Sequence, residues 1–267
     1  MAVKPWEGSF PAFQIWGNLY FVGTIPASTH IIDTGEGLIM LDSGYQHSLY
    51  LVLYNMYTLG LDPMNLKYIL HTHGHIDHMG ATKALVELTG AKTAIGRPDR
   101  DYVNGKLDLS WAKELGVPFD GPFEADILLE DGDEITLGNT TVRALATPGH
   151  TPGAMSYLFA VTDGQQKYAA GLHGGMGLNS MSREFLDKYG LGYECRSQFL
   201  EAMDRISGEK VDIYLGNHMQ QNGTVEKYQR LLKGERLAFV DPTEWSRSAQ
   251  QAKESLLKMM KEEQESL

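Results

Sequence analysis

The sequence predicts an α/β protein in which two mixed sheets face each other, with helices on the outside. Two observations carry this prediction. Short extended segments are followed by a helical segment in the first third of the chain, and the same order recurs in outline after residue 91. Of the 267 residues, 42% are hydrophobic and 21% are charged, a composition that supplies a globular core. We therefore expect a single domain over residues 1–267, built from two pseudo-repeated halves of roughly 1–90 and 91–267.

The first half opens with β-branched and aromatic runs that Gly and Pro separate, which is typical of antiparallel strands. A helix follows, because Tyr50, Tyr54 and Tyr57 share one helical face and Gly60 ends the pattern. The expected strands are 13–16, 19–23, 29–33, 37–42 and 67–71, and the expected helices are 47–59 and 81–88.

The second half repeats this arrangement with more strands. Its expected strands are 92–95, 126–129, 134–137, 140–146, 155–161, 167–170 and 211–215, and its expected helices are 197–206, 225–233 and 244–262. Two long irregular stretches remain, residues 104–123 and 171–193. Loops of this length more often cover sites than cores.

Charge and composition exclude several classes of protein. Lys and Arg number 23 against 34 Asp and Glu, a formal net charge of −11, which disfavours nucleic acid and anionic membranes as partners. Residues 1–10 lack the apolar core of a signal peptide, so we expect a cytoplasmic protein, or a periplasmic or secreted one if a leader has been removed. The single cysteine, Cys195, excludes an internal disulfide. A small-molecule substrate is the expected partner, and the oligomeric state stays open.

Histidines are concentrated in one short segment. Residues 73–78 read His-Gly-His-Ile-Asp-His, between a predicted strand and a predicted helix. Four potential ligands on one such loop can converge on one point or on two adjacent points, which favours a pair of metal ions. The alternative is a polar loop with hydrogen-bonded core histidines, the interpretation that we prefer for His71. His150 and His218 each follow a predicted strand and are further candidates.

Five motifs occur in one order along residues 13–218: LDSG at 41–44, HGHIDH at 73–78, DGDEITLG at 131–138, TPGHTPG at 147–153 and GNH at 216–218. In these motifs the chain resembles the metallo-β-lactamase superfamily of zinc hydrolases. The resemblance implies a four-layer αββα sandwich. It assigns His73, His75 and His150 to a first zinc ion, and Asp77, His78 and His218 to a second, hence two Zn²⁺ per chain.

The resemblance also implies roles for two aspartates. Asp77 is the catalytic residue, because it would hold the attacking hydroxide as well as bind the second zinc. Asp42 would orient a ligand imidazole; the alternative is a carboxylate that only closes a turn at the end of a strand.

A departure from the wider superfamily narrows the resemblance. Many members carry a metal-bridging Asp after the strand that follows the third His, whereas here residues 168–175 read YAAGLHGG. The remaining ligand set resembles subclass B3 of the β-lactamases, as do residues 17–23 and 241–245. Gly171 and His173 stand where that subclass contacts substrate, so we expect the loop 171–179 to line the cleft beside the second zinc. For His173 the alternative is a residue that only caps the loop.

The implied activity is opening of the β-lactam amide by a hydroxide shared between two zinc ions, and with it antibiotic resistance. The first alternative is a hydrolase of another ester, lactone or phosphoester, because fold and metal do not select the substrate. The others are a di-iron module that reduces oxygen or nitric oxide, and a noncatalytic metal-stabilised binding protein. Open coordination positions argue against the last, since structural zinc sites are normally closed.

Overall fold

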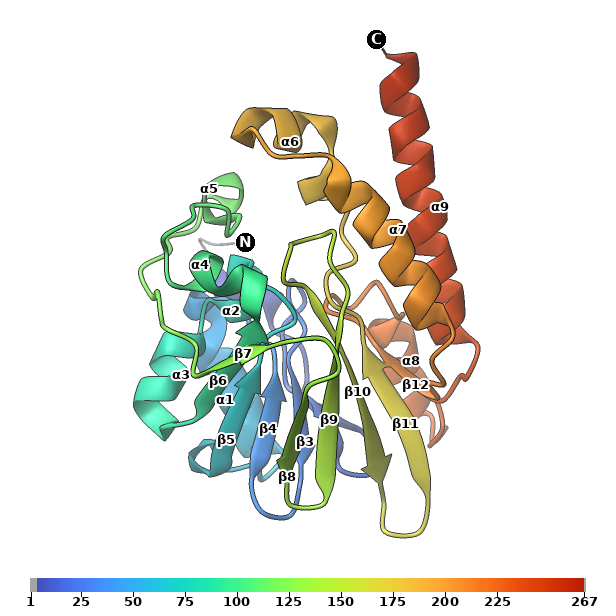
Figure 1. The fold of residues 1–267 in the computed structure, drawn as a ribbon. Helices are drawn as coiled ribbons and strands as arrows, with labels where there is room; N and C mark the ends of the chain where they lie inside the picture. The colour runs from blue at the N-terminus through green and yellow to red at the C-terminus, as the bar shows by residue number, and fades with distance from the viewer. Residues whose placement is uncertain (1–3, 267) are drawn as a thin grey trace.

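The protein consists of two mixed β-sheets packed face to face between two layers of helices (Figure 1). The computed structural model describes residues 4–266, so residues 1–3 and 267 of the predicted domain lie outside the described residues. The first sheet has seven strands in the order β1-β2-β3-β4-β5-β6-β7, and the second has five in the order β12-β11-β10-β9-β8. The predicted αββα sandwich is confirmed.

The strands match the predicted ones closely. In the first sheet they are β1 (Phe13–Trp16), β2 (Leu19–Phe21), β3 (His30–Asp33), β4 (Leu38–Leu41), β5 (Leu66–Leu70), β6 (Lys92–Gly96) and β7 (Ile127–Leu129). In the second they are β8 (Glu134–Leu137), β9 (Thr140–Ala146), β10 (Met155–Thr162), β11 (Lys167–Leu172) and β12 (Ile213–Leu215). The sheets therefore divide between β7 and β8 rather than at residue 90. An internal duplication at that position stays a prediction.

Helices cover the outer face of each sheet. The predicted ones are α1 (Leu49–Thr58), α3 (Thr82–Thr89), α7 (Glu194–Ser207), α8 (Thr224–Leu232) and α9 (Glu244–Glu265). Four short helices were not predicted: α2 (Ile76–Met79), α4 (Arg100–Val103), α5 (Ala112–Leu115) and α6 (Arg183–Tyr189). Three of these are single turns, too short to show a helical period. For α6 the sequence did hold a signal, because Ser182 caps its first turn and Gly190 ends it in a left-handed conformation.

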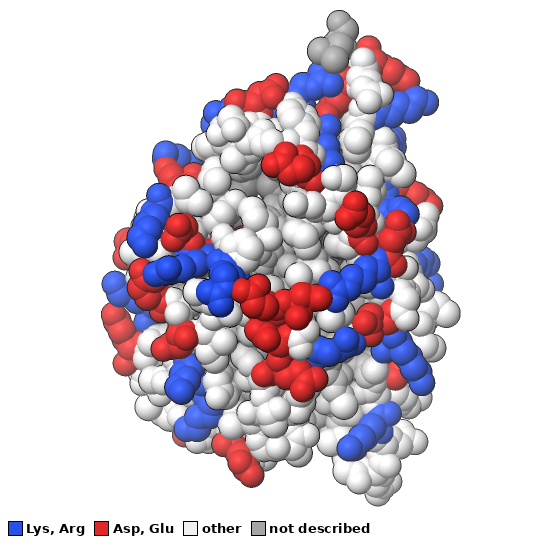
Figure 2. Space-filling model, in the orientation of Figure 1, with Lys and Arg blue, Asp and Glu red and all other residues white. Residues whose placement is uncertain are grey.

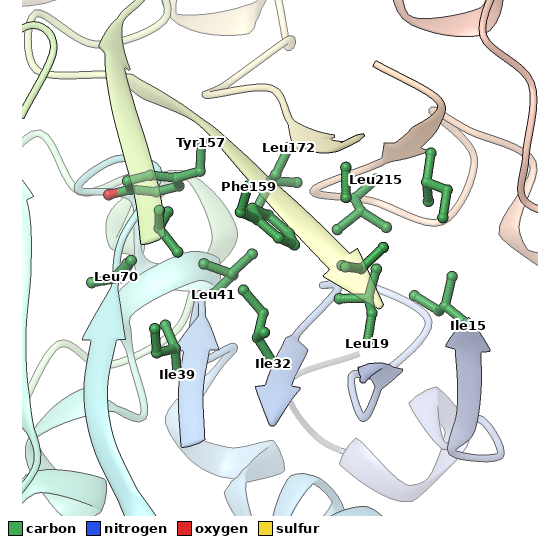
Figure 3. Packing of buried hydrophobic residues seen from close by; sticks show 14 of the residues in the cluster. Ile15, Leu19, Ile32, Ile39, Leu41, Leu70, Tyr157, Phe159, Leu172 and Leu215 are labelled. Carbon is green, nitrogen blue, oxygen red and sulfur yellow. The ribbon is translucent and has the colours of Figure 1, made fainter. Parts of the chain in front are cut away.

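The main core lies between the sheets, where side chains from both inner faces meet (Figure 3). Ile32, Leu41 and Leu70 contribute from the first sheet, and Tyr157 and Phe159 from the second; none is more than 5% exposed. Hydrophobic burial on this scale is the dominant favourable term in folding. The rigid sandwich holds the loops at one edge in fixed positions.

A separate cluster joins the second sheet to its helices. Trp245, at the start of α9, is 1% exposed and donates a hydrogen bond from Nε1 to the carbonyl oxygen of Ile206, 2.7 Å away. Phe199 of α7 and Leu256 of α9 pack in the same cluster. Across residues 4–266, no helix has the length and apolar character that crossing a membrane requires.

Candidate metal centre

The histidine-bearing loops meet at one edge of the sandwich. Residues 71–75 follow β5 and lead into α2, His150 follows β9, and His218 follows β12. Each loop thus leaves the carboxyl end of its strand. The predicted convergence of segments far apart in the sequence is present in the structure.

Three imidazoles form the first group, which we call the three-histidine group: His73, His75 and His150. One potential ligand atom from each lies within 4.8 Å of those of the other two. Their ring centroids are 4.6 to 4.7 Å apart, and all three residues are buried. Such spacing fits three ligands around one ion and leaves a position open.

Asp77, His78 and His218 form the second group, the Asp-His-His group. The Oδ2 atom of Asp77 lies 3.2 Å from Nε2 of His78 and 3.5 Å from Nε2 of His218. The rings of His73 and His78 are 4.2 Å apart, so the two groups adjoin each other.

The hydrogen bonds of the imidazoles show which ring nitrogens are free. Nδ1 of His150 donates to the Gly177 carbonyl at 2.7 Å, and Nδ1 of His218 donates to the Pro26 carbonyl at 2.8 Å. Each ring therefore keeps a lone pair on Nε2. Nε2 of His73 is buried and has no hydrogen-bond partner among the described residues. A buried polar atom without a partner is costly, and this donor set fits Zn²⁺.

Asp42 connects the three-histidine group and the Asp-His-His group through hydrogen bonds. It accepts hydrogen bonds from Nδ1 of His78 at 2.8 Å, from the backbone N–H of Thr72 at 2.7 Å and from the Thr72 hydroxyl at 2.8 Å. That hydroxyl lies 3.0 Å from Nδ1 of His73, which donates to it. The predicted orienting contact between Asp42 and an imidazole is therefore present, and φ of 55° at Asp42 shows a strained backbone at this position.

The electrostatics of the centre favour a cation. Burial lowers the pKa of His73 and His75 well below the usual value, and lowers that of His150 to about 4, so these rings are neutral at pH 7. Burial also opposes charge on His78, but the carboxylates of Asp77 and Asp42 outweigh it and raise the pKa of His78 to about 10. Both carboxylates stabilise positive charge here, which a divalent metal ion would supply.

The two groups open into a cleft of about 440 Å³. Apolar side chains of Ile25, Trp111 and Met176 line it together with the amides of Asn179 and Gln221. In Figure 2, Asp, Glu, Lys and Arg form a band across the middle of the molecule, and the hollowed surface directly above this band is mostly uncharged. Trp111 comes from the irregular stretch 104–123, which the sequence predicted to cover a site. Met176 and Asn179 belong to the loop 171–179, which the sequence predicted to line the cleft. Ile25 and Gln221 were not predicted, since uncharged side chains in loops carry no motif.

The expected positions of Gly171 and His173 at the cleft are wrong. β11 continues to Leu172, because it pairs with β10 and β12 on both sides, so residue 171 still belongs to the sheet. A Cβ on Gly171 would meet Trp245 at 2.8 Å. His173 is fully buried, and its ring stacks on that of Trp245 at 3.6 Å. Both residues face α9 rather than the substrate cleft.

The later part of the same loop does reach the cleft. Gly175 and Gly177 line it and lie against the ring of His150, where added Cβ atoms would approach the ring to 2.4 and 3.2 Å. The loop therefore lies beside the three-histidine group, not beside the Asp-His-His group as expected. His71 is a packed residue, as predicted: its ring nitrogens bond to the Ala94 carbonyl and the Thr82 hydroxyl.

Replacing His173 by phenylalanine is expected to preserve the ring stack on Trp245. The free energy of unfolding of this variant should fall less steeply as the pH is lowered. Burial lowers the pKa of His173 to about 3 from 6.5, and Tyr214 and Trp245 surround the ring. The folded state thus resists protonation, and stability falls as the pH drops below 6.5, by about 1.4 kcal/mol per pH unit for one such group. Denaturant unfolding between pH 7 and pH 4 measures this slope. An identical slope in the variant would contradict the account.

Fold and site together define the class of protein: an αββα sandwich with two adjacent groups of potential metal ligands at one edge. The sequence profile of the metallo-β-lactamase superfamily matches residues 22–163, more than half of the chain, so the protein belongs to this superfamily.

Solved structures agree over the whole length. The subclass B3 metallo-β-lactamase BJP-1 of Bradyrhizobium japonicum is 27% identical, with a TM-score of 0.88 over 100% of this chain and 99% of that one. The predicted resemblance to subclass B3 is thereby confirmed.

Curated relatives match over a shorter segment. A probable metallo-hydrolase of Burkholderia pseudomallei is 40% identical over 97 residues, which are 35% of this chain and 31% of that protein. A probable polyketide biosynthesis zinc-dependent hydrolase of Bacillus subtilis is 32% identical over 95 residues, 36% of this chain and 35% of that protein. The chain thus spans about a third of the length of these two relatives.

Proposed function

We propose that the protein is a binuclear zinc hydrolase that opens the β-lactam amide. His73, His75 and His150 would hold one zinc ion, and Asp77, His78 and His218 the other. The observation that carries the proposal is the pair of adjacent ligand groups with free ring nitrogens beside an open cleft. When bound, zinc polarises a carbonyl and lowers the pKa of a water ligand toward neutrality.

Residues of the chain supply the rest of the proposed reaction. Burial disfavours the ionised form of Asp77, but His78, His218 and His75 outweigh it and lower the pKa of this carboxyl group. Asp77 is therefore a carboxylate at neutral pH. We assign it the role of accepting a hydrogen bond from the attacking water. Ile25, Trp111 and Met176 would exclude bulk water, while the amides of Asn179 and Gln221 would orient the substrate.

A second candidate is a hydrolase of another ester, lactone or phosphoester in the same centre. The cleft favours it in one respect: among its described lining residues, none is a lysine or arginine that would pair with the carboxylate of a β-lactam. The matched curated relatives carry the general names of metallo-hydrolase and zinc-dependent hydrolase.

A parallel assay tests both candidates. The zinc-loaded protein is offered a penicillin, a cephalosporin and a carbapenem beside a lactone, a thioester and a phosphodiester, with His150→Ala as the control for contaminating activity. We expect kcat/KM on a β-lactam to exceed that on every other substrate by at least about tenfold, which corresponds to 1.4 kcal/mol of transition-state stabilisation. The reverse ranking would establish the second candidate.

A further inference from the structure

A buried carboxylate outside the two ligand groups joins the loops that carry the three-histidine group. Asp99 ends the short 3-10 turn Arg97–Asp99 after β6, and it is 0% exposed. Its Oδ2 accepts hydrogen bonds from the backbone N–H of Gly74 at 2.8 Å and from the Thr151 hydroxyl at 2.6 Å. Its Oδ1 accepts one from the backbone N–H of Gly153 at 2.6 Å.

The partners of Asp99 adjoin the proposed ligands on both sides. Gly74 stands between His73 and His75, and Thr151 directly follows His150. One side chain thus bonds to two loops that lie far apart in the sequence. Charge-assisted hydrogen bonds of this kind are stronger than neutral ones, so they fix the separation of the loops.

Close backbone packing around Asp99 depends on glycine. A Cβ on Gly74 would come within 2.6 Å of Tyr102 Cβ, and one on Gly153 within 2.5 Å of the backbone nitrogen of Asp99. A Cβ on Gly96, at the end of β6, would lie 2.0 Å from the carbonyl oxygen of Gly153. The two loops therefore approach β6 and the following turn at backbone distance, where a small shift of one loop moves a histidine.

We propose that Asp99 is a positioning residue that sets the distance between the loop of His73 and His75 and the loop of His150, and through it the metal affinity of the three-histidine group. The inference rests on the proposed metal centre. The expected effect is confined to the three-histidine group, because Asp99 makes no hydrogen bond to residues 76–79 or 216–221 among its contacts in the described chain. The Asp-His-His group should keep its affinity when Asp99 is changed.

The test compares Asp99→Asn with Asp126→Asn. Asparagine keeps the size of aspartate but turns one accepting oxygen into an NH₂ group, which leaves at least one of the two backbone donors facing another donor. Asp126, an exposed residue, is the control for the hydrogen-bond pattern, since its Oδ2 likewise accepts a backbone N–H and a hydroxyl, both from Thr93, at 2.8 and 2.9 Å. Its contacts lie between β6 and β7, on neither ligand loop.

Metal affinity is measured by cobalt(II) titration of the metal-free proteins, followed by visible absorption and by zinc competition with a coloured chelator. We expect two equivalents in the wild type and in Asp126→Asn. In Asp99→Asn one equivalent should bind at least about tenfold more weakly, the scale known for groups that orient metal ligands. The spectrum of its remaining tight equivalent should match that of His150→Ala and differ from that of His218→Ala.

Two outcomes separate the inference from the proposed function. Equal affinities for both ions in Asp99→Asn and the wild type would overturn the positioning role, even if the variant melts earlier. A wild type that binds neither cobalt nor zinc would overturn the proposed function itself. If Asp99→Asn does not fold, Thr151→Val and Thr151→Ser replace it. The valine variant should weaken one equivalent and the serine variant should restore it; wild-type affinity in both would contradict the role.

Discussion

Replacing Asp77 by alanine is expected to lower kcat on the best substrate by about a hundredfold to ten-thousandfold, with a much smaller change in KM. The carboxylate lies 3.2 Å from Nε2 of His78 and 3.5 Å from that of His218, and it faces the cleft. Its proposed contact with the attacking water strengthens only as the reaction proceeds, so its loss should affect turnover more than substrate binding. Steady-state kinetics of the zinc-loaded variant give both constants.

Asp120→Ala is the control for that variant, because Asp120 is an exposed aspartate outside the cleft lining. It should leave kcat and KM unchanged. An Asp77→Ala variant with a raised KM and the kcat of the wild type would show that Asp77 contributes to binding alone.

Trp245→Ala is expected to lower the free energy of unfolding by about 3 to 5 kcal/mol, the usual cost of removing a buried aromatic side chain. The indole stacks on His173 at 3.6 Å, donates a hydrogen bond to the Ile206 carbonyl and packs between α9 and the second sheet. Denaturant unfolding at pH 7 measures the change. Trp6→Ala serves as the comparison, since Trp6 is 59% exposed and should cost less than 1 kcal/mol. Equal losses in the two variants would contradict the role of Trp245.

The strands could be predicted because their signal is local. Alternating and β-branched runs bounded by Gly and Pro place β9 at Thr140–Ala146, and the structure has the same bounds. The short helix α2 could not be predicted, because four residues do not show a helical period. β11 extends beyond its predicted end because of two neighbouring strands, a tertiary effect that a local pattern does not contain.

The candidate ligands could be identified because several histidines and an aspartate at close spacing are typical of metal-binding loops and rare in other loops. Their mutual distances could not be predicted, since His73 and His150 lie in loops that follow strands of different sheets and meet only in the folded chain. Asp99 illustrates the limit most clearly. In the sequence Gly-Arg-Pro-Asp-Arg it has the appearance of an exposed turn residue, yet the fold buries it completely. Charged residues are seldom buried, so composition gives no reason to expect it there.

The central claim is that two zinc ions occupy two defined groups of ligands. Crystals of the zinc-loaded protein, with diffraction recorded on both sides of the zinc absorption edge, test it most directly. The account predicts two anomalous peaks per chain, one at about 2.0 to 2.2 Å from nitrogens of His73, His75 and His150 and one at the same range from Asp77, His78 and His218. A single peak at full zinc loading, or peaks bound by other residues, would contradict it.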